Sequence, residues 1–203
     1  MHSNKYTIVG WLAVAQAILF PLSITLAIVE KGVATNLFDF HKPFFGPSDV
    51  LGLIFTAIAI YVLWMFKNLL NDHYEYHDLD LLILISIWWA ALFQVVGLGL
   101  GFLTMIFWPV DEKVFALVYI VFFASSMICI GIVDILIAVK LLKVKEHFSE
   151  YIRAFAYITI VAGICEITVF LSPITLLMIP VTCIILALIF FKDKRENHTV
   201  DYV

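Results

Sequence analysis

A run of thirty residues, 81–110, contains no Asp, Glu, Lys, Arg or His. As an α-helix it would be about 45 Å long at about 1.5 Å per residue, which exceeds the apolar core of a bilayer, about 30 Å thick. Helices of water-soluble proteins have a polar face, and this run has none. The run therefore predicts a membrane-spanning helix near the middle of the chain.

Similar apolar runs recur along the chain and determine its class. The sequence is 64% hydrophobic and 14% charged, against about 25% charged residues in an average soluble domain. No stretch between the runs is long enough for a separate soluble domain. We therefore expect an all-α, polytopic membrane protein that forms one domain and contacts the lipid bilayer. It would be a bundle of six transmembrane helices at about 7–29, 48–66, 81–108, 114–139, 154–171 and 174–191, followed by a charged tail, 192–203, that we expect to be disordered.

Three boundaries carry local signals. The run 7–29 exceeds the apolar core of a signal peptide, about 7–15 residues, and no Ala-x-Ala follows it, so we expect it to be retained. Ser48 is predicted to be the N-cap of the second span, with Asp49 in the first turn. The run 154–191 would be about 57 Å long as one helix, so Ser172 and Pro173 are predicted to separate two spans.

The positions of Lys and Arg predict the orientation. With six spans, the N-terminus, the second and fourth loops and the tail share one side of the membrane. That side holds nine Lys and Arg residues, and the other side holds three. Because positive residues accumulate on the cytoplasmic side, both termini are predicted to be cytoplasmic. The compact, domain-free design favours a bacterial inner membrane.

Polar side chains within the spans are the main functional candidates, because a charge at mid-depth costs about 2.5–3.5 kcal/mol even on the mildest scale. Gln16, Gln94 and Glu166 lie in the first, third and fifth spans, which run in the same direction. If these spans face one another, the side chains form a polar intramembrane site for a proton, a cation or a polar ligand. The alternative is that the amides are hydrogen-bonded packing contacts and Glu166 is protonated among them.

The fourth span carries three further polar residues. Asp134 is a candidate for the same polar site; the alternative is an ion pair with Lys140 or Arg153 at the membrane interface. Ser125 and Ser126 are expected to hydrogen-bond to the backbone of their own helix.

A loop before the third span contains two histidines. If the third span extends backward as a helix, His73, His77 and Asp80 share one face at positions i, i+4 and i+7. Imidazole and carboxylate ligands at that spacing can bind zinc or another transition metal. The alternatives are a pH-sensing loop and an ordinary solvated interfacial loop.

Gly97 and Gly101 have the G-x-x-x-G spacing that lets two membrane helices approach closely. This face predicts close packing within the bundle, self-association or binding of a partner protein, or a flexible gate.

Several motifs are missing from the sequence. It has no H-E-x-x-H, G-x-S-x-G, P-loop or C-x-x-C-H motif, so we expect no cofactor. The three cysteines lie in apolar runs without a C-x-x-C and are expected to be small core residues. With a net charge of −4 and no basic cluster, nucleic acid is not an expected partner.

Three function classes remain. The first is a small transporter or channel-like component in which Glu166, Gln16 and Gln94 line a polar path. The second is a non-catalytic membrane partner, such as an assembly, immunity or sensory subunit, favoured by the Gly97/Gly101 face and the aromatic loop at 30–47. The third is an intramembrane enzyme that uses the His73/His77/Asp80 loop. Transport is the first hypothesis, and a non-enzymatic role is favoured over an enzymatic one.

Overall fold

The computed structural model describes residues 3–32, 46–106, 112–144, 148–168 and 171–200, and these residues form helices and turns but no strand. Five of the helices are long and apolar enough to cross a membrane, which confirms the expectation of an all-α, multi-pass membrane protein. The described helices are α1 (Ser3–Gly32), α2 (Pro47–Tyr74), α3 (Asp80–Ile106), α4 (Glu112–Lys143), α5 (Glu150–Ile167) and α6 (Ser172–Val200).

The helix α5 is the exception among the predicted spans. It has only 18 residues and includes Glu150, Arg153 and Glu166. The membrane-compatible stretches are Lys5–Glu30, Pro47–Tyr74, Asp80–Gly99, Ile120–Lys143 and Pro173–Lys192. The predicted break near Ser172 is confirmed, since α5 ends at Ile167 and α6 begins at Ser172.

The start of α2 differs from the prediction. The N-cap is Gly46, and Pro47 occupies the first helical turn, where its missing N–H costs no hydrogen bond. Asp49 lies in the first turn as expected and accepts a hydrogen bond from the Gly46 N–H at 2.8 Å. Ser48 is therefore not the cap, and its N–H and hydroxyl both donate to the Glu30 carboxylate at the end of α1. Most of the aromatic loop preceding it, 33–45, lies outside the described residues.

The end of α6 also differs from the prediction. The charged tail was expected to be disordered, but α6 continues to Val200. The residues from Lys192 onward are mostly charged or polar and several of them are good helix formers, so the helix can extend beyond the apolar span into water.

The helices pack in chain order. Each helix contacts the next one in sequence, and α6 packs against α1. Among the described residues, α1, α3 and α5 do not pack extensively against one another. The condition for a shared polar cluster on the first, third and fifth spans is therefore not met.

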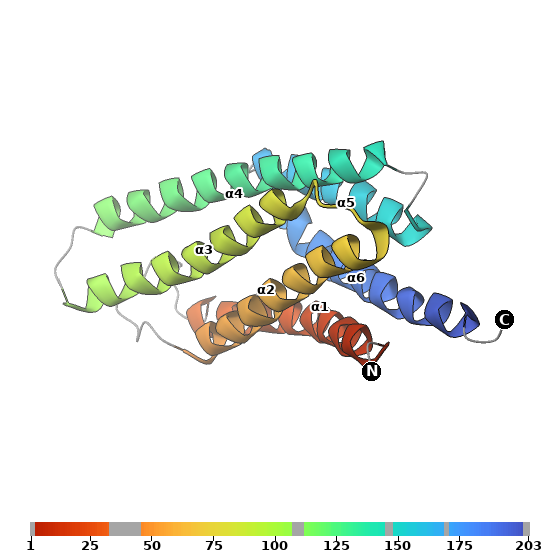
Figure 1. Ribbon diagram of the computed structural model, residues 1–203. Coiled ribbons are helices and arrows are strands. Elements are labelled where there is room, and N and C mark those ends of the chain that lie inside the picture. The colour runs from red at the N-terminus through yellow and green to blue at the C-terminus, as the bar shows by residue number, and fades with distance from the viewer. Residues whose placement is uncertain (1–2, 33–45, 107–111, 145–147, 169–170, 201–203) are drawn as a thin grey trace.

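The hydrophobic core is concentrated at one end of the bundle. The start of α1 and the end of α6 lie toward this end (Figure 1). The Tyr6 ring stacks on Phe190 at 6.2 Å, and its hydroxyl donates to Asp72 at 3.1 Å. We call this end of the bundle the core end. The opposite end, where α3 finishes and α4 begins, is the far end. Buried core residues come from 6–13, 62–70, 79–83, 137–141, 148–156 and 186–190.

The far end is more open. On α4, the side chains of Val114, Leu117, Val118, Ile120 and Val121 are 48–62% exposed. Val114, Leu117, Val118 and Val121 stand at positions i, i+3, i+4 and i+7, and Ile120 adjoins them, so one broad face of α4 presents apolar surface here. Figure 1 shows α3 and α4 extending past α5 toward this end.

Candidate functional site

The helices α4 and α5 approach each other closely at Gly131 and Gly163. A Cβ atom added to Gly131 would lie 2.6 Å from the carbonyl oxygen of Gly163, and one added to Gly163 would lie 2.7 Å from that of Gly131. Real Cβ atoms do not come so close to backbone oxygens. The two glycines therefore allow a contact that no other residue type permits, as small residues do between membrane helices.

The face of α5 that carries Gly163 is polar. Thr159, Gly163 and Glu166 stand at positions i, i+4 and i+7 and form one stripe along the helix. Thr159 is 5% exposed and Glu166 is 6% exposed. The Cβ atom of Glu166 lies 3.0 Å from the position that a Cβ on Gly131 would occupy. The stripe thus faces α4, away from lipid.

Several buried polar atoms of the described residues have no hydrogen-bond partner. Within the described residues they include Glu166 Oε2 and Thr159 Oγ1 on α5, Ser126 Oγ on α4 and Thr175 Oγ1 on α6. Several other hydroxyls bond to the backbone of their own helix, as Ser125 does to the Phe122 carbonyl at 2.9 Å. The prediction for the two serines is therefore confirmed for Ser125 and wrong for Ser126.

Asp134 lies one turn beyond Gly131 on α4, and Gly131 faces the Cβ atom of Glu166, so both carboxyl groups belong to the same α4–α5 contact. The basic residues proposed as its partners have other contacts. The Lys140 Nζ donates to the Asp78 carbonyl oxygen at 2.8 Å, and the Arg153 guanidinium lies 4.0 Å from the Glu150 carboxylate. We call Asp134, Thr159 and Glu166 the carboxyl site.

The two glutamines lie elsewhere. Gln94 on α3 accepts a hydrogen bond from the Thr56 hydroxyl on α2 at 3.3 Å. Gln16 is 6% exposed within α1, which packs against α2 and α6. The Gln94 contact is of the kind that holds membrane helices together.

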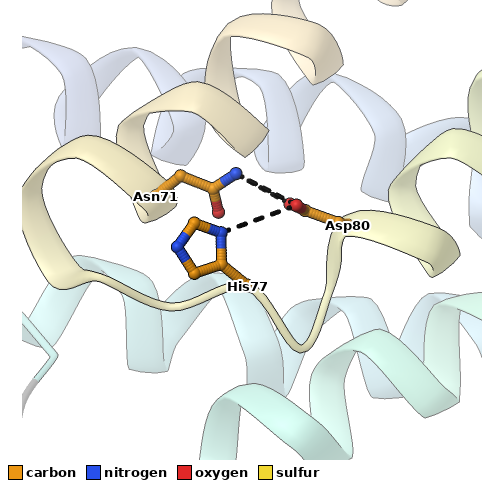
Figure 2. A network of polar contacts seen from close by, with 3 residues as sticks. All are labelled: Asn71, His77 and Asp80. Carbon is orange, nitrogen blue, oxygen red and sulfur yellow. Dashed lines mark hydrogen bonds and ion pairs between the residues drawn. The ribbon is translucent and has the colours of Figure 1, made fainter.

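The histidine loop does not continue α3. The helix α2 includes His73, and α3 begins at Asp80, so the two histidines and Asp80 do not share a helical face. The His73 ring instead lies 5.5 Å from the Tyr6 ring. In Figure 2, Asn71 and His77 both point toward Asp80. The Asn71 amide donates to Asp80 at 2.9 Å and His77 Nδ1 lies 3.6 Å from Asp80 Oδ2. Within the described part of the chain, no three His, Cys, Asp or Glu side chains are grouped so as to hold a metal ion.

The same loop is tied to the start of the α4–α5 connection. The Tyr76 hydroxyl donates to the Lys140 carbonyl oxygen at 3.4 Å. The rings of Tyr74 and Tyr76 both pack edge-on against Phe148, at 5.2 and 5.4 Å. Burial raises the pKa of Tyr76 above its usual value, and the negative charge of Asp78 raises it further. We call these contacts the loop clasp.

The G-x-x-x-G face is not closely packed within the described chain. No described atom lies within 4 Å of a Cβ added to Gly97 or Gly99. The surroundings of Gly101 lie outside the described residues. Close packing at Gly97 is therefore not seen among the described residues. Packing and self-association through this face stay predictions.

No protein-family model, curated protein or solved structure matches this chain. The functional argument thus depends on the geometry of the site itself. Sequence reasoning identified Glu166 and Asp134 but missed Gly131, Gly163 and Thr159. The spacing Thr159-x₃-Gly163-x₂-Glu166 was the available signal, since it places two polar groups and a glycine on one helical face.

Proposed function

We propose that this protein is a small transporter or channel-like component whose ion-binding position is the carboxyl site. The observation that carries the proposal is Glu166: its side chain is 6% exposed, and its Oε2 atom has no hydrogen-bond partner in the described structure. An acidic group inside the membrane is costly and is most often retained for function. When an ion binds to the site, its interaction with the carboxyl group offsets that cost.

The position of the site supports this role. Gly131 and Asp134 follow the exposed far-end segment of α4 and precede the core residues at 137–141. The site therefore lies where tight packing gives way to the open far end. The short, charged helix α5 contributes two of the three side chains of the carboxyl site, Thr159 and Glu166. We further propose a bacterial inner membrane as its location, on the compact, domain-free design.

A flux measurement tests the proposal. The full chain is reconstituted into lipid vesicles containing a membrane-potential dye, and gradients of K⁺, Na⁺ and H⁺ are imposed one at a time. We expect the wild type to dissipate at least one gradient. We expect Glu166→Gln to reduce the signal to that of protein-free vesicles, because the amide has a similar shape but cannot carry negative charge.

The matched control is Glu150→Gln. Glu150 is the same residue type on the same helix, but its side chain is 88% exposed. The Glu150→Gln variant should dissipate the ion gradients as the wild type does. A wild-type protein that dissipates none of the three gradients would overturn the transport proposal and favour the membrane-partner hypothesis, for which the open face at Gly97 is the available surface.

A further inference from the structure

We infer that the ion taken up by the carboxyl site is a proton, exchanged between water and the pair formed by Asp134 and Glu166. This inference rests on the proposed function and gives the class of its substrate. Three features of the site support it: the space available, the ligands present and the hydroxyl group of Thr159.

The space at the site is small. The backbones of α4 and α5 are in contact at Gly131 and Gly163, where even a methyl group would overlap a carbonyl oxygen. Glu166 stands one turn from Gly163 and its Cβ faces Gly131. A hydrated or desolvated metal ion would have to push the helices apart. A proton needs no volume of its own.

The ligand set is also too small for a metal ion. Ca²⁺ takes about 6–8 oxygen ligands, and Mg²⁺ requires a near-octahedral set. The carboxyl site offers two carboxyl groups and one hydroxyl. No group of three metal-binding side chains occurs in the described residues. A proton requires a single oxygen atom.

The Thr159 hydroxyl is an independent indication. It is 5% exposed, it lies on the stripe that faces α4, and its oxygen has no partner in the described structure. A hydroxyl can donate to a carboxylate or, after rotation, accept from a carboxylic acid. Thr159 stands about 10 Å along the helix axis from Glu166, so it makes this face polar without placing a fixed positive charge beside the carboxyl group.

The step itself is a simple proton transfer. On uptake, a hydronium ion gives its proton to a carboxylate oxygen of Glu166, an O–H bond forms, and water is released. On discharge, that bond breaks and the proton passes to Asp134 or to water. Two neighbouring carboxylates in a medium of low dielectric constant repel each other, so one negative charge is removed when the pair takes up one proton.

Other ionisable groups near α5 are few. On the helices packed against it, the described membrane-spanning parts carry Asp134 and Cys129 on α4 and Cys183 on α6, and α5 itself carries Tyr157 and Cys165. Most basic residues of these helices are toward the core end: Lys140, Lys143, Arg153, Lys192, Lys194 and Arg195. Lys113 is at the opposite end, in the first turn of α4.

Infrared difference spectroscopy of the protein in lipid nanodiscs tests the inference. The carbonyl stretch of a protonated carboxyl group is separate from the bands of a carboxylate. We expect a protonated-carboxyl band that is lost as the pH is raised from mildly acidic to mildly alkaline values. It should be absent from Glu166→Gln and retained in Glu150→Gln. Exchange of choline chloride for sodium chloride at constant pH should leave the band unchanged.

Asp134→Asn provides a second variant if Glu166→Gln does not fold. It removes the neighbouring negative charge, so the midpoint of the band's titration should move to lower pH. A band that persists at every pH would mean a permanently neutral Glu166 in a packing role, and would overturn the inference. So would the lack of any such band, or its loss when sodium is added. Because the readout does not require transport, a titrating band without ion flux would overturn only the proposed function, whereas flux without a titrating band would overturn only this inference.

Discussion

Gly131 and Gly163 are the residues at which the smallest substitution has the largest expected effect. Gly131→Ala or Gly163→Ala would place a methyl group 2.6–2.7 Å from a backbone carbonyl oxygen of the facing helix. A backbone atom cannot rotate away as a side chain can, so α4 and α5 must separate. Overpacking of this kind costs about 1–3 kcal/mol. We expect both variants to unfold at lower temperature than the wild type.

The cysteines of the protein provide the measurement. Cys165 and Cys183 are buried and Cys129 is exposed, so a thiol-reactive dye reports unfolding in a Cys129→Ser background. The matched controls are Gly97→Ala and Gly99→Ala, where no described atom lies within 4 Å of the added methyl group. These should match or exceed the wild type, since Ala favours a helix over Gly by about 1 kcal/mol. Equal melting temperatures for all four variants would contradict the close contact.

At the residue scale, the depth of a polar side chain in the membrane could be predicted from the sequence, but the direction in which it points could not. Depth in the membrane follows from position within an apolar run, so Glu166 and Gln94 were recognised as intramembrane polar groups. The direction in which a side chain points depends on how each helix is rotated about its axis. In runs that are apolar on all sides the sequence contains little information about that rotation. The Thr56 partner of Gln94 and the approach of α4 to Glu166 were therefore not predictable.

The loop between α2 and α3 is the element whose stability should depend on pH. The Tyr76 hydroxyl donates to the Lys140 carbonyl oxygen, and burial followed by the charge of Asp78 raises the pKa of Tyr76. A phenol whose pKa is higher in the folded state contributes its full stability below its unfolded pKa, near 10. The contribution is lost as the pH rises through the folded value. The loop clasp should therefore weaken only in strongly alkaline solution.

Tyr76→Phe isolates this contribution. The variant keeps the ring that packs on Phe148 but loses the donor, so we expect it to be less stable than the wild type near neutral pH by about 0.5–1.5 kcal/mol. That difference should shrink as the pH is raised past 10, because the wild-type phenolate can no longer donate. Melting temperatures of the two proteins across the alkaline range measure it. A constant difference at all pH values would show that the hydroxyl does not titrate as part of the clasp.

At the scale of elements, the sequence predicted the presence of each helix more accurately than its ends. Apolar run lengths predicted every helix, because an α-helix is the usual way for a single chain segment to satisfy its backbone in lipid. The ends were less accurate. The start of α2 depends on Glu30, 18 residues earlier in the chain, and the extension of α6 into water is decided by polar residues with no hydrophobic pattern. Local patterns do not contain such information.

The arrangement of the whole molecule makes a prediction about topology. The start of α1, the loop clasp and the end of α6 meet at the core end, which is the side with the excess of Lys and Arg. We therefore expect Lys5→Cys and Glu150→Cys to be protected from a membrane-impermeant maleimide in intact cells, and Val114→Cys at the far end to react. All three should react after permeabilisation. The Cys129→Ser background removes the exposed native thiol.

The opposite labelling pattern would reverse the predicted orientation. Different results for positions 5 and 150 would contradict the shared core end itself. The chain-order packing of the helices could not be derived from the sequence, because short loops favour contact between consecutive spans but do not determine where α6 closes against α1. The contact between α1 and α6 includes Gly10, where an added Cβ atom would lie 2.6 Å from the Phe191 ring.

Because the core is concentrated at one end of the bundle, a small rotation of a long helix at that end would displace its other end by a larger distance. A helix of about 30 residues is about 45 Å long, so a rotation of about 5° at its base displaces its tip by about 4 Å. Repacking of a few core side chains is thereby amplified along α3 and α4 to a distance comparable with the size of a side chain. The carboxyl site is near the base of α4, just before the core residues at 137–141, so such a rotation would change the angle between α4 and α5 there more than their separation.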